Sequence, residues 1–280
     1  MIVYSSETST SKPLRNQAKL WIVSFGSDSD YVSIAIDTIS RLHKLYPYSN
    51  CLIYEVDDLP DDIISYAKTY SVGYGYWQWK PWLVNETLEK MNEGDVLLYV
   101  DGRCGVPRRS IDWLDSLLHQ DTNQAETVDL VAWMTNEVEH KWTTGDLFHK
   151  LNLDINSSYG DSFQYAATFF ALRLNKASSN FVNNWHSFMK DNPEFCRDEI
   201  SQIANHPNFV NNRHDQSVFS LMLKRYSSQG LQLRTLIQKD IQNGRSIIPH
   251  DKPHPGAPEK NASIRFIKRA IKKTYRLFKE

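Results

Sequence analysis

The sequence predicts an α/β fold in which helices flank a mainly parallel sheet. Apolar runs of strand length alternate along the chain with segments of helical periodicity, and the connections between them are short. The clearest strand, residues 96–100, is a continuous apolar run between Gly94-Asp95 and Asp101-Gly102, which is typical of a strand buried on both faces of a sheet. With 280 residues, of which 41% are hydrophobic, the chain is long enough for one large domain with short appendages.

Three strands and three helices are expected in the first part of the chain. The predicted strands are residues 20–25, 51–54 and 96–100. The predicted helices are residues 31–45, 60–70 and one that opens within 75–82, where Pro81 suits the first turn. Small and acidic residues at 26–30 suit a turn that caps the first of these helices.

The second part continues the alternation. We expect strands at 129–134, 165–172 and 232–234, and helices at 110–119, 176–189 and 217–226. A loop at 142–148 leads into a short helix, and 247–258 is a proline-rich loop. The chain therefore divides into a flexible N-terminus (1–18), a single α/β domain (19–258) and a basic C-terminal helix (259–280).

Composition excludes several classes of protein. No apolar run approaches the ~20 residues of a membrane span, and the N-terminus lacks a charged segment followed by a long apolar one, so we expect no cleaved signal peptide. Cys51, Cys104 and Cys196 are an odd number without metal-ligand spacing, which favours a reducing cytoplasm.

The C-terminal segment differs in charge from the rest of the chain. Residues 260–280 carry eight lysines and arginines against one glutamate, a net charge of +7, so the remaining residues carry −8 of the total −1. Ile264, Ile267, Ile271 and Phe278 form an apolar stripe beside these basic residues. An interfacial helix on anionic lipid fits this coincidence, at the inner face of the membrane. A solvated terminal helix is the alternative, and the acidic body of the chain argues against nucleic acid as a partner.

Asp101 is the first candidate for chemistry, because it follows a strand whose carboxyl end lies where ligands of open α/β folds bind. It either caps a turn or holds a divalent cation against a diphosphate. Arg103 either contacts a phosphate or carboxylate or lies in solvent.

Two further clusters are candidates. Lys80 follows Trp77 and Trp79 at a predicted helix start, which suits either an anion site with stacking rings or a core of aromatic residues beside a solvated lysine. Residues 213–216 (RHDQ) open a late apolar helix, where Asp215 is either a cap or part of a cleft.

His250 and His254, in the proline-rich loop, are either surface residues or a late metal or phosphate contact.

Three strings in this order resemble bacterial glycosyltransferases of the nucleotide-diphospho-sugar transferase superfamily, which have the GT-A fold. They are GYWQWKP at 75–81, GDVLLYVDG at 94–102 and RHDQS at 213–217. The resemblance covers about residues 21–254, nearly the whole chain except its termini. It implies a GT-A-like (Rossmann-like) fold and transfer of a sugar from a nucleotide-diphospho-sugar to a saccharide or lipid-linked acceptor in surface polysaccharide or glycolipid synthesis.

The resemblance also implies roles for single residues. Asp101 is then the metal and diphosphate residue, with Mn²⁺ or Mg²⁺ as cofactor, and His250 or His254 completes the metal site. Asp215 and Gln216 lie beside the transferred sugar as the catalytic pair. The donor-binding residues are Asp101 and seven others: Ser24, Phe25, Gly26, Trp77, Lys80, Arg103 and Gln164.

The chain departs from the pattern of retaining GT-A enzymes at Arg103, where these enzymes have a second aspartate. One carboxylate fewer weakens a metal site, whereas an arginine neutralises a diphosphate leaving group directly. Inverting transfer needs a carboxylate base, for which Asp215 is the candidate, and retaining transfer would place Asp215 and Gln216 on the donor face. The residues leave both stereochemical courses open.

Three other functions are compatible with an α/β fold. A nucleotidyltransferase would carry a glycine-rich loop with arginine and lysine after its first strand, whereas this chain has SFGSDSD at 24–30. A phosphatase with an Asp-x-Asp-Gly nucleophile fails because position 99 is Tyr99. A non-catalytic sugar-nucleotide-binding or assembly protein of the same fold remains the alternative.

Overall fold

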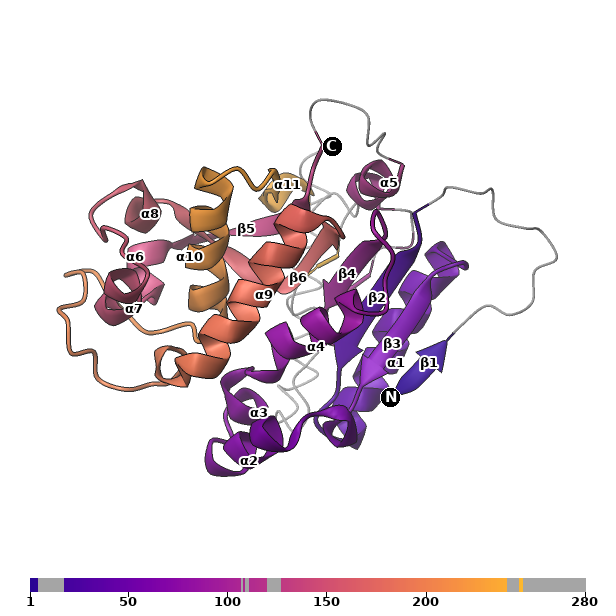
Figure 1. Ribbon diagram of the computed structural model, residues 1–280, viewed down its shortest axis with the longest axis horizontal. Helices are drawn as coiled ribbons and strands as arrows, with labels where there is room; N and C mark the ends of the chain where they lie inside the picture. Colours follow the sequence, from indigo (N-terminus) through magenta and orange to yellow (C-terminus); the bar gives the residue numbers. More distant parts are fainter. Residues whose placement is uncertain (5–17, 107, 109–110, 120–126, 241–246, 249–280) are drawn as a thin grey trace, which may run out of the picture.

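The centre of the molecule is a mixed β-sheet, seen in the computed structural model of the chain (Figure 1). The structure describes residues 1–4, 18–106, 108, 111–119, 127–240 and 247–248. Within these residues the sheet has seven strands in the order β1-β3-β2-β4-β6-β5-β7. The strands are β1 (Ile2–Tyr4), β2 (Leu20–Phe25), β3 (Asn50–Tyr54), β4 (Val96–Val100), β5 (Leu130–Val138), β6 (Phe163–Arg173) and β7 (Leu233–Leu236).

The α/β class is confirmed, and the pairing of the strands is mixed. β3, β2 and β4 are mutually parallel, as are β5 and β7. β6 runs antiparallel to both β4 and β5, and β1 is antiparallel to β3. β1 lies within the N-terminal stretch that was expected to be flexible, and its pairing with β3 corrects that expectation for residues 2–4.

Helices cover both faces of the sheet. The longer ones are α1 (Ser29–Leu45), α2 (Asp61–Thr69), α4 (Trp79–Leu88), α5 (Asp112–Leu118), α9 (Lys176–Asp191) and α10 (Asp215–Ser228). Short helical segments are η1 (Val56–Asp58), α3 (Gly73–Tyr76), α6 (Glu139–Trp142), α7 (Gly145–Lys150), α8 (Ser158–Asp161), η2 (Pro193–Cys196) and α11 (Gln238–Asp240).

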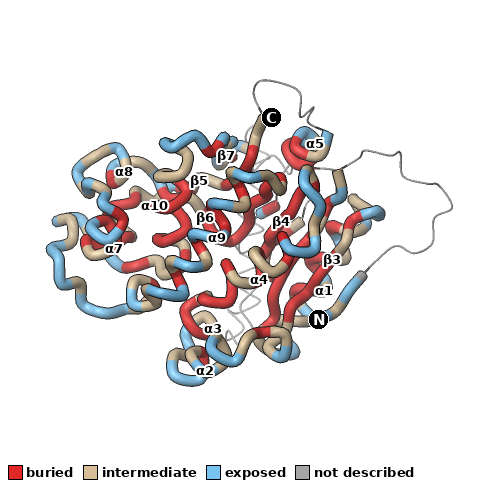
Figure 2. Tube along the Cα trace, in the orientation of Figure 1, coloured by how far each residue is buried: buried red, intermediate tan, exposed pale blue. Residues whose placement is uncertain are grey.

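Two apolar cores result, one on each face of the sheet. Side chains of α4, α9 and α10 pack against alternate residues of the strands, such as Leu97 and Phe170. The intervening residues, such as Leu98 and Phe169, face α1 and α5 on the other side. Figure 2 shows the strands as the most continuously buried part of the chain. The alternation follows from the strand period of two, and it explains why β4 is apolar at all five positions.

The carboxyl ends of β2 and β4 reach the same edge of the sheet because these neighbours are parallel. After β2 the chain turns at Gly26 into α1, which Asp28 caps by accepting hydrogen bonds from the backbone N–H groups of Asp30 and Tyr31. A Cβ at Gly26 would lie 2.5 Å from the backbone nitrogen of Val32, so this close approach requires glycine.

The aromatic segment before α4 differs from the expected helix start. All five residues from Gly73 to Trp77 have positive φ, between +50° and +82°. They form a left-handed turn, and the right-handed helix α4 begins at Trp79. For an L-residue this conformation costs about 1–2 kcal/mol, so Tyr74, Tyr76 and Trp77 are strained and must be held by their surroundings.

No helix among the described residues is long and apolar enough to cross a membrane. The expected basic helix at 259–280 and the loop histidines His250 and His254 lie outside the described residues.

Candidate active site

A cleft of about 700 Å³ opens at the carboxyl ends of β2 and β4. Its wall is built from the end of β2, the start of α1, the left-handed turn, the residues after β4, the middle of β6 and the start of α10. These are segments far apart in sequence that the sheet brings together. The cleft therefore lies where the strand order places ligands in open α/β sheets.

Lys80 occupies the floor of the cleft and is almost completely buried, with 2% of the residue exposed. Its ammonium Nζ donates to Asp215 Oδ2 at 2.6 Å and to the backbone carbonyl of Ala167 on β6 at 3.2 Å. Asp101 Oδ1 lies 3.8 Å from the same nitrogen. One buried positive charge thus lies between two carboxylates, one directly after β4 and one at the start of α10.

The charges of this cluster depend on one another. Burial lowers the pKa of Lys80, but Asp101 and Asp215 outweigh that effect, and the pKa is raised overall. Burial raises the pKa of Asp215, and the hydrogen bond and positive charge of Lys80 limit the increase. At neutral pH we therefore assign a protonated Lys80 and an ionised Asp215.

Asp101 is fixed from two sides. Its Oδ1 accepts a hydrogen bond of 2.5 Å from the Tyr99 hydroxyl, and its backbone N–H donates to the carbonyl of Thr168 at 2.8 Å. Tyr99 is fully buried in β4, and burial, followed by the charge of Asp101, raises its pKa well above the ordinary value. The Tyr99 hydroxyl therefore stays protonated and donates.

Aromatic side chains also line the cleft. Phe25 stacks on Trp79 with ring centroids 4.1 Å apart, and Tyr74 lies 6.0 Å from Phe25. Trp77 is stacked against His214, with centroids at 5.5 Å and an angle of 22° between the planes. Flat rings of this kind suit a nucleobase or a sugar ring.

His214 precedes α10 in a strained conformation. Its φ of 56° and ψ of −126° lie in a region that favours glycine, and its Nδ1 is 2.8 Å from the carbonyl of Cys196. The carbonyl can only accept, so Nδ1 carries the hydrogen in this contact. The strain is located next to Asp215, in the wall of the cleft.

Most of the predicted residues meet in the cleft. Phe25, Trp77, Lys80, Asp101, Arg103, Asp215 and Gln216 all line it. Ser24 and Gly26 flank Phe25 without lining the cleft, and Gln164 is fully buried behind Gln216, to which it is hydrogen-bonded at 2.8 Å. For these three, direct contact with a donor remains a prediction without support from their position.

Several lining residues carry no role in the sequence-based assignment. Tyr31, Tyr74 and Thr168 belong to this group, together with Arg213 and His214. Arg213 and His214 adjoin Asp215 in the RHDQ string, so their position next to a candidate residue could have indicated that they line the cleft. Tyr31 and Thr168 are ordinary helix and strand residues by pattern, and only the fold brings them to the cleft.

A divalent cation is not supported by the described residues. Among them, no three histidine, cysteine, aspartate or glutamate side chains are grouped as metal ligands. Asp101, the one predicted ligand inside the described ranges, already contacts Tyr99 and the Lys80 ammonium. Because a cation such as Mg²⁺ needs several oxygen ligands, the described part of the cleft does not fit one by itself.

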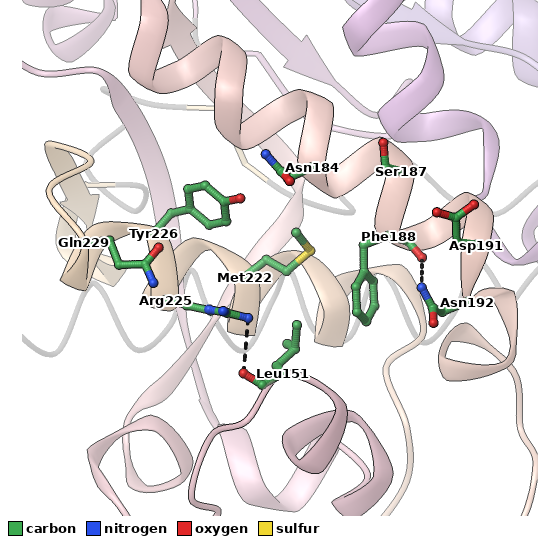
Figure 3. Close-up of a pocket in the computed structure, with 10 residues that line it drawn as sticks. All are labelled: Leu151, Asn184, Ser187, Phe188, Asp191, Asn192, Met222, Arg225, Tyr226 and Gln229. Atoms are coloured by element: carbon green, nitrogen blue, oxygen red, sulfur yellow. Dashed lines mark hydrogen bonds between the residues drawn. The ribbon is translucent and has the colours of Figure 1, made fainter.

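A second cavity of about 320 Å³ lies between α9 and α10 (Figure 3). Asp191 and Arg225 are its charged side chains, and Arg225 donates to the carbonyl of Leu151 at 3.2 Å. No buried ion pair connects the residues that line it. The cleft is therefore the stronger candidate for an active site.

Comparison with known proteins gives structural neighbours only. No protein-family model matches the chain, and neither does any curated protein sequence. Among solved structures, a glycosyltransferase involved in glycosylation of the major capsid of PBCV-1 has a TM-score of 0.43 and 11% identity, covering 84% of this chain and 90% of its own.

Mouse xyloside xylosyltransferase 1 has a TM-score of 0.43 and 10% identity, covering 78% of this chain and 84% of its own. The galactosyltransferase LgtC, solved with donor and acceptor sugar analogs, has a TM-score of 0.41 and 11% identity, with 77% and 72% covered. All three are glycosyltransferases. At TM-scores below 0.5 we draw no conclusion about activity from these likenesses.

Proposed function

We propose that this chain is a glycosyltransferase that moves a sugar from a nucleotide-diphospho-sugar to a saccharide or lipid-linked acceptor. The observation that carries the proposal is the buried Lys80 ammonium between Asp101 and Asp215, on the floor of a cleft at the carboxyl ends of parallel strands. The resemblance of the three sequence strings to GT-A enzymes supports the same assignment.

The cleft provides groups for each part of such a donor. Phe25, Tyr74 and Trp77 offer flat surfaces for the nucleobase or sugar. Arg103 and Arg213 offer guanidinium groups to a diphosphate, whose negative charge grows as the sugar leaves. Because charge stabilisation and positioning dominate this chemistry, no step requires a covalent partner.

Asp215 has two candidate roles. In inverting transfer it would take the proton of the acceptor hydroxyl, a role for which an ionised carboxylate with a raised pKa is suited. In retaining transfer Asp215 and Gln216 would lie against the donor sugar. The configuration of the product at the anomeric carbon distinguishes the two roles.

The acceptor and cellular place complete the proposal. We assign the enzyme to surface polysaccharide or glycolipid synthesis, at the cytoplasmic face of a membrane that the basic residues 260–280 would contact. An acceptor anchored in that membrane would then be available to the bound enzyme.

Arg103 favours one alternative, a sugar-nucleotide-binding or assembly protein of the same fold without turnover. With an arginine in place of a second carboxylate, the cleft has fewer oxygen ligands for a catalytic cation. This alternative predicts donor binding without release of nucleoside diphosphate.

The test is donor binding and hydrolysis with a panel of UDP-, GDP- and CMP-sugars, with and without Mn²⁺, on the wild type and Asp101→Ala. We expect slow release of nucleoside diphosphate from one donor class and its loss in Asp101→Ala. Binding of a donor without release, with or without an acceptor extract, would favour the alternative. Absence of binding to every donor would contradict both functions.

A further inference from the structure

Glu139, the first residue of α6, is completely buried behind the cleft. Its Oε1 accepts hydrogen bonds from Thr143 Oγ1 at 2.6 Å and Gln164 Nε2 at 2.8 Å. Its Oε2 accepts from Ser220 Oγ at 2.5 Å and from the Lys224 ammonium at 2.7 Å. The carboxylate is thus paired with a positive charge and surrounded by donors, as a buried charge must be.

This carboxylate determines which way the Gln164 amide points. An ionised carboxylate has no hydrogen to donate, so Gln164 must present its Nε2 group to Glu139. The opposite orientation would place the Gln164 carbonyl oxygen against the carboxylate and leave two acceptors facing each other. Gln164 Oε1 consequently points away from Glu139, toward α10.

The Gln164 oxygen accepts a hydrogen bond from Gln216. Gln216 Nε2 donates to Gln164 Oε1 at 2.8 Å. One hydrogen of the Nε2 group is used in this bond, which turns the nitrogen toward Gln164 and the carbonyl oxygen Oε1 of this cleft-lining side chain to the other side of the amide.

We propose that Glu139 and Gln164 are positioning residues that fix the amide of Gln216 with its oxygen, rather than its nitrogen, toward the cleft. Lys224 holds Glu139, Glu139 orients the Gln164 amide, and Gln164 in turn orients the Gln216 amide in the cleft. This inference rests on the proposed function, and it means that the Gln216 oxygen accepts a hydrogen bond from a donor group of the substrate, such as a sugar hydroxyl.

The orientation can be tested without any assay of activity, through Gln216→Glu. If Gln164 presents Oε1, the introduced carboxyl group can satisfy it only when protonated, so the pKa of that carboxyl in the folded protein rises above the unfolded value of about 4.3. A raised folded-state pKa gives stability that is present at low pH and is lost as the pH rises through that pKa.

The charged and titratable groups of the cleft are Asp28, Tyr31, Tyr74, Lys80, Asp101, Arg103, Arg213, His214 and Asp215, with Glu139 and Lys224 behind it, and all are present in both proteins. Differences from the wild type therefore report on the introduced carboxyl group. We expect the Tm of Gln216→Glu to fall relative to the wild type by roughly 3 °C or more between pH 5 and pH 8.

The matched control is Gln229→Glu, an exposed position at the end of the same helix, where we expect no such widening of the difference. A Tm difference for Gln216→Glu that stays constant, or narrows as the pH rises, would overturn the orientation. The result does not depend on whether the protein transfers sugars.

Gln164→Leu tests the consequence for catalysis. It also provides a second test of the proposal if Gln216→Glu does not fold. The leucine side chain provides no acceptor, so the Gln216 amide is free to rotate, while Glu139 keeps three of its four donors. We expect kcat to fall at least about 10-fold with the KM for the donor changed less than about twofold. A merely structural role predicts a lower Tm with an unchanged kcat of the folded enzyme, and that result would overturn the proposal.

Discussion

The Lys80 ammonium contacts Asp215 on α10, which lies 135 positions further along the chain, as well as Asp101 after β4. Each of the three was recognisable in the sequence, because each follows a strand end or opens a helix. Their mutual contact was not. A lysine at a helix start is ordinarily solvated, and the fold buries this one by placing it against Ala167 of β6 and Asp215 of α10.

The residue-scale prediction concerns Lys80→Met, which keeps the length of the side chain and removes its charge. Asp215 would then be buried without a counter-ion beside Asp101, which should lower the free energy of unfolding by about 3 kcal/mol at pH 7. Its folded-state pKa would rise further above the unfolded value, so the lost stability should partly return as the pH falls and Asp215 takes up a proton.

Urea unfolding of Lys80→Met and the wild type at pH 5 and pH 8 measures this effect. Lys90→Met is a matched control, because Lys90 lies on the surface at the end of the same helical segment and pairs with Glu86. An equal, pH-independent loss in the two variants would show that the buried cluster has no special electrostatic role.

At the scale of elements, strands and helices were predicted better than the direction and handedness of the chain. β2 and β4 have the predicted limits. The antiparallel direction of β6 could not be inferred, because an apolar run buried on both faces has the same composition in either direction. The left-handed turn before α4 was also unpredictable, because three of its five residues are not glycine.

Gly75→Ala tests this turn. At a φ of +82° an alanine is strained, and its Cβ would lie 3.2 Å from Ala67 of α2, so we expect a loss of about 2 kcal/mol in the free energy of unfolding. Gly230→Ala is the control, because Gly230 also has positive φ, at +110°, but a Cβ there meets nothing within 4 Å. If Gly75→Ala were no less stable than Gly230→Ala in urea, the close packing of the turn against α2 would carry no energetic weight.

For the whole molecule, the sequence predicted an α/β domain with its site at one edge of the sheet. The mixed strand order places β6 beside the central strand β4, so that Ala167 and Thr168 contribute to the cleft from a strand with no motif of its own. Gln164, near the start of β6, illustrates the remaining limit. Its assignment as a donor contact came with the resemblance, whereas its position behind Gln216 is visible only from three-dimensional contacts.

Residues 260–280 carry the prediction at this scale. Deleting 261–280 should release the protein from vesicles that contain anionic lipid, because the deletion removes nearly all of the local positive charge, while the Tm should change little. Co-sedimentation of both forms with anionic and neutral vesicles measures the effect. Equal binding of the truncated form to anionic vesicles would exclude the segment as the membrane contact.

The most direct measurement of the central claim compares two conservative substitutions in a transfer assay with the donor class identified by the panel. Asp215→Asn removes the charge of the carboxylate that Lys80 holds in the cleft, and Asp191→Asn makes the same change at the second cavity. We expect transfer to fall at least about 100-fold in Asp215→Asn and to stay within about twofold of the wild type in Asp191→Asn. Full activity of a folded Asp215→Asn would contradict the assignment of the cleft as the active site.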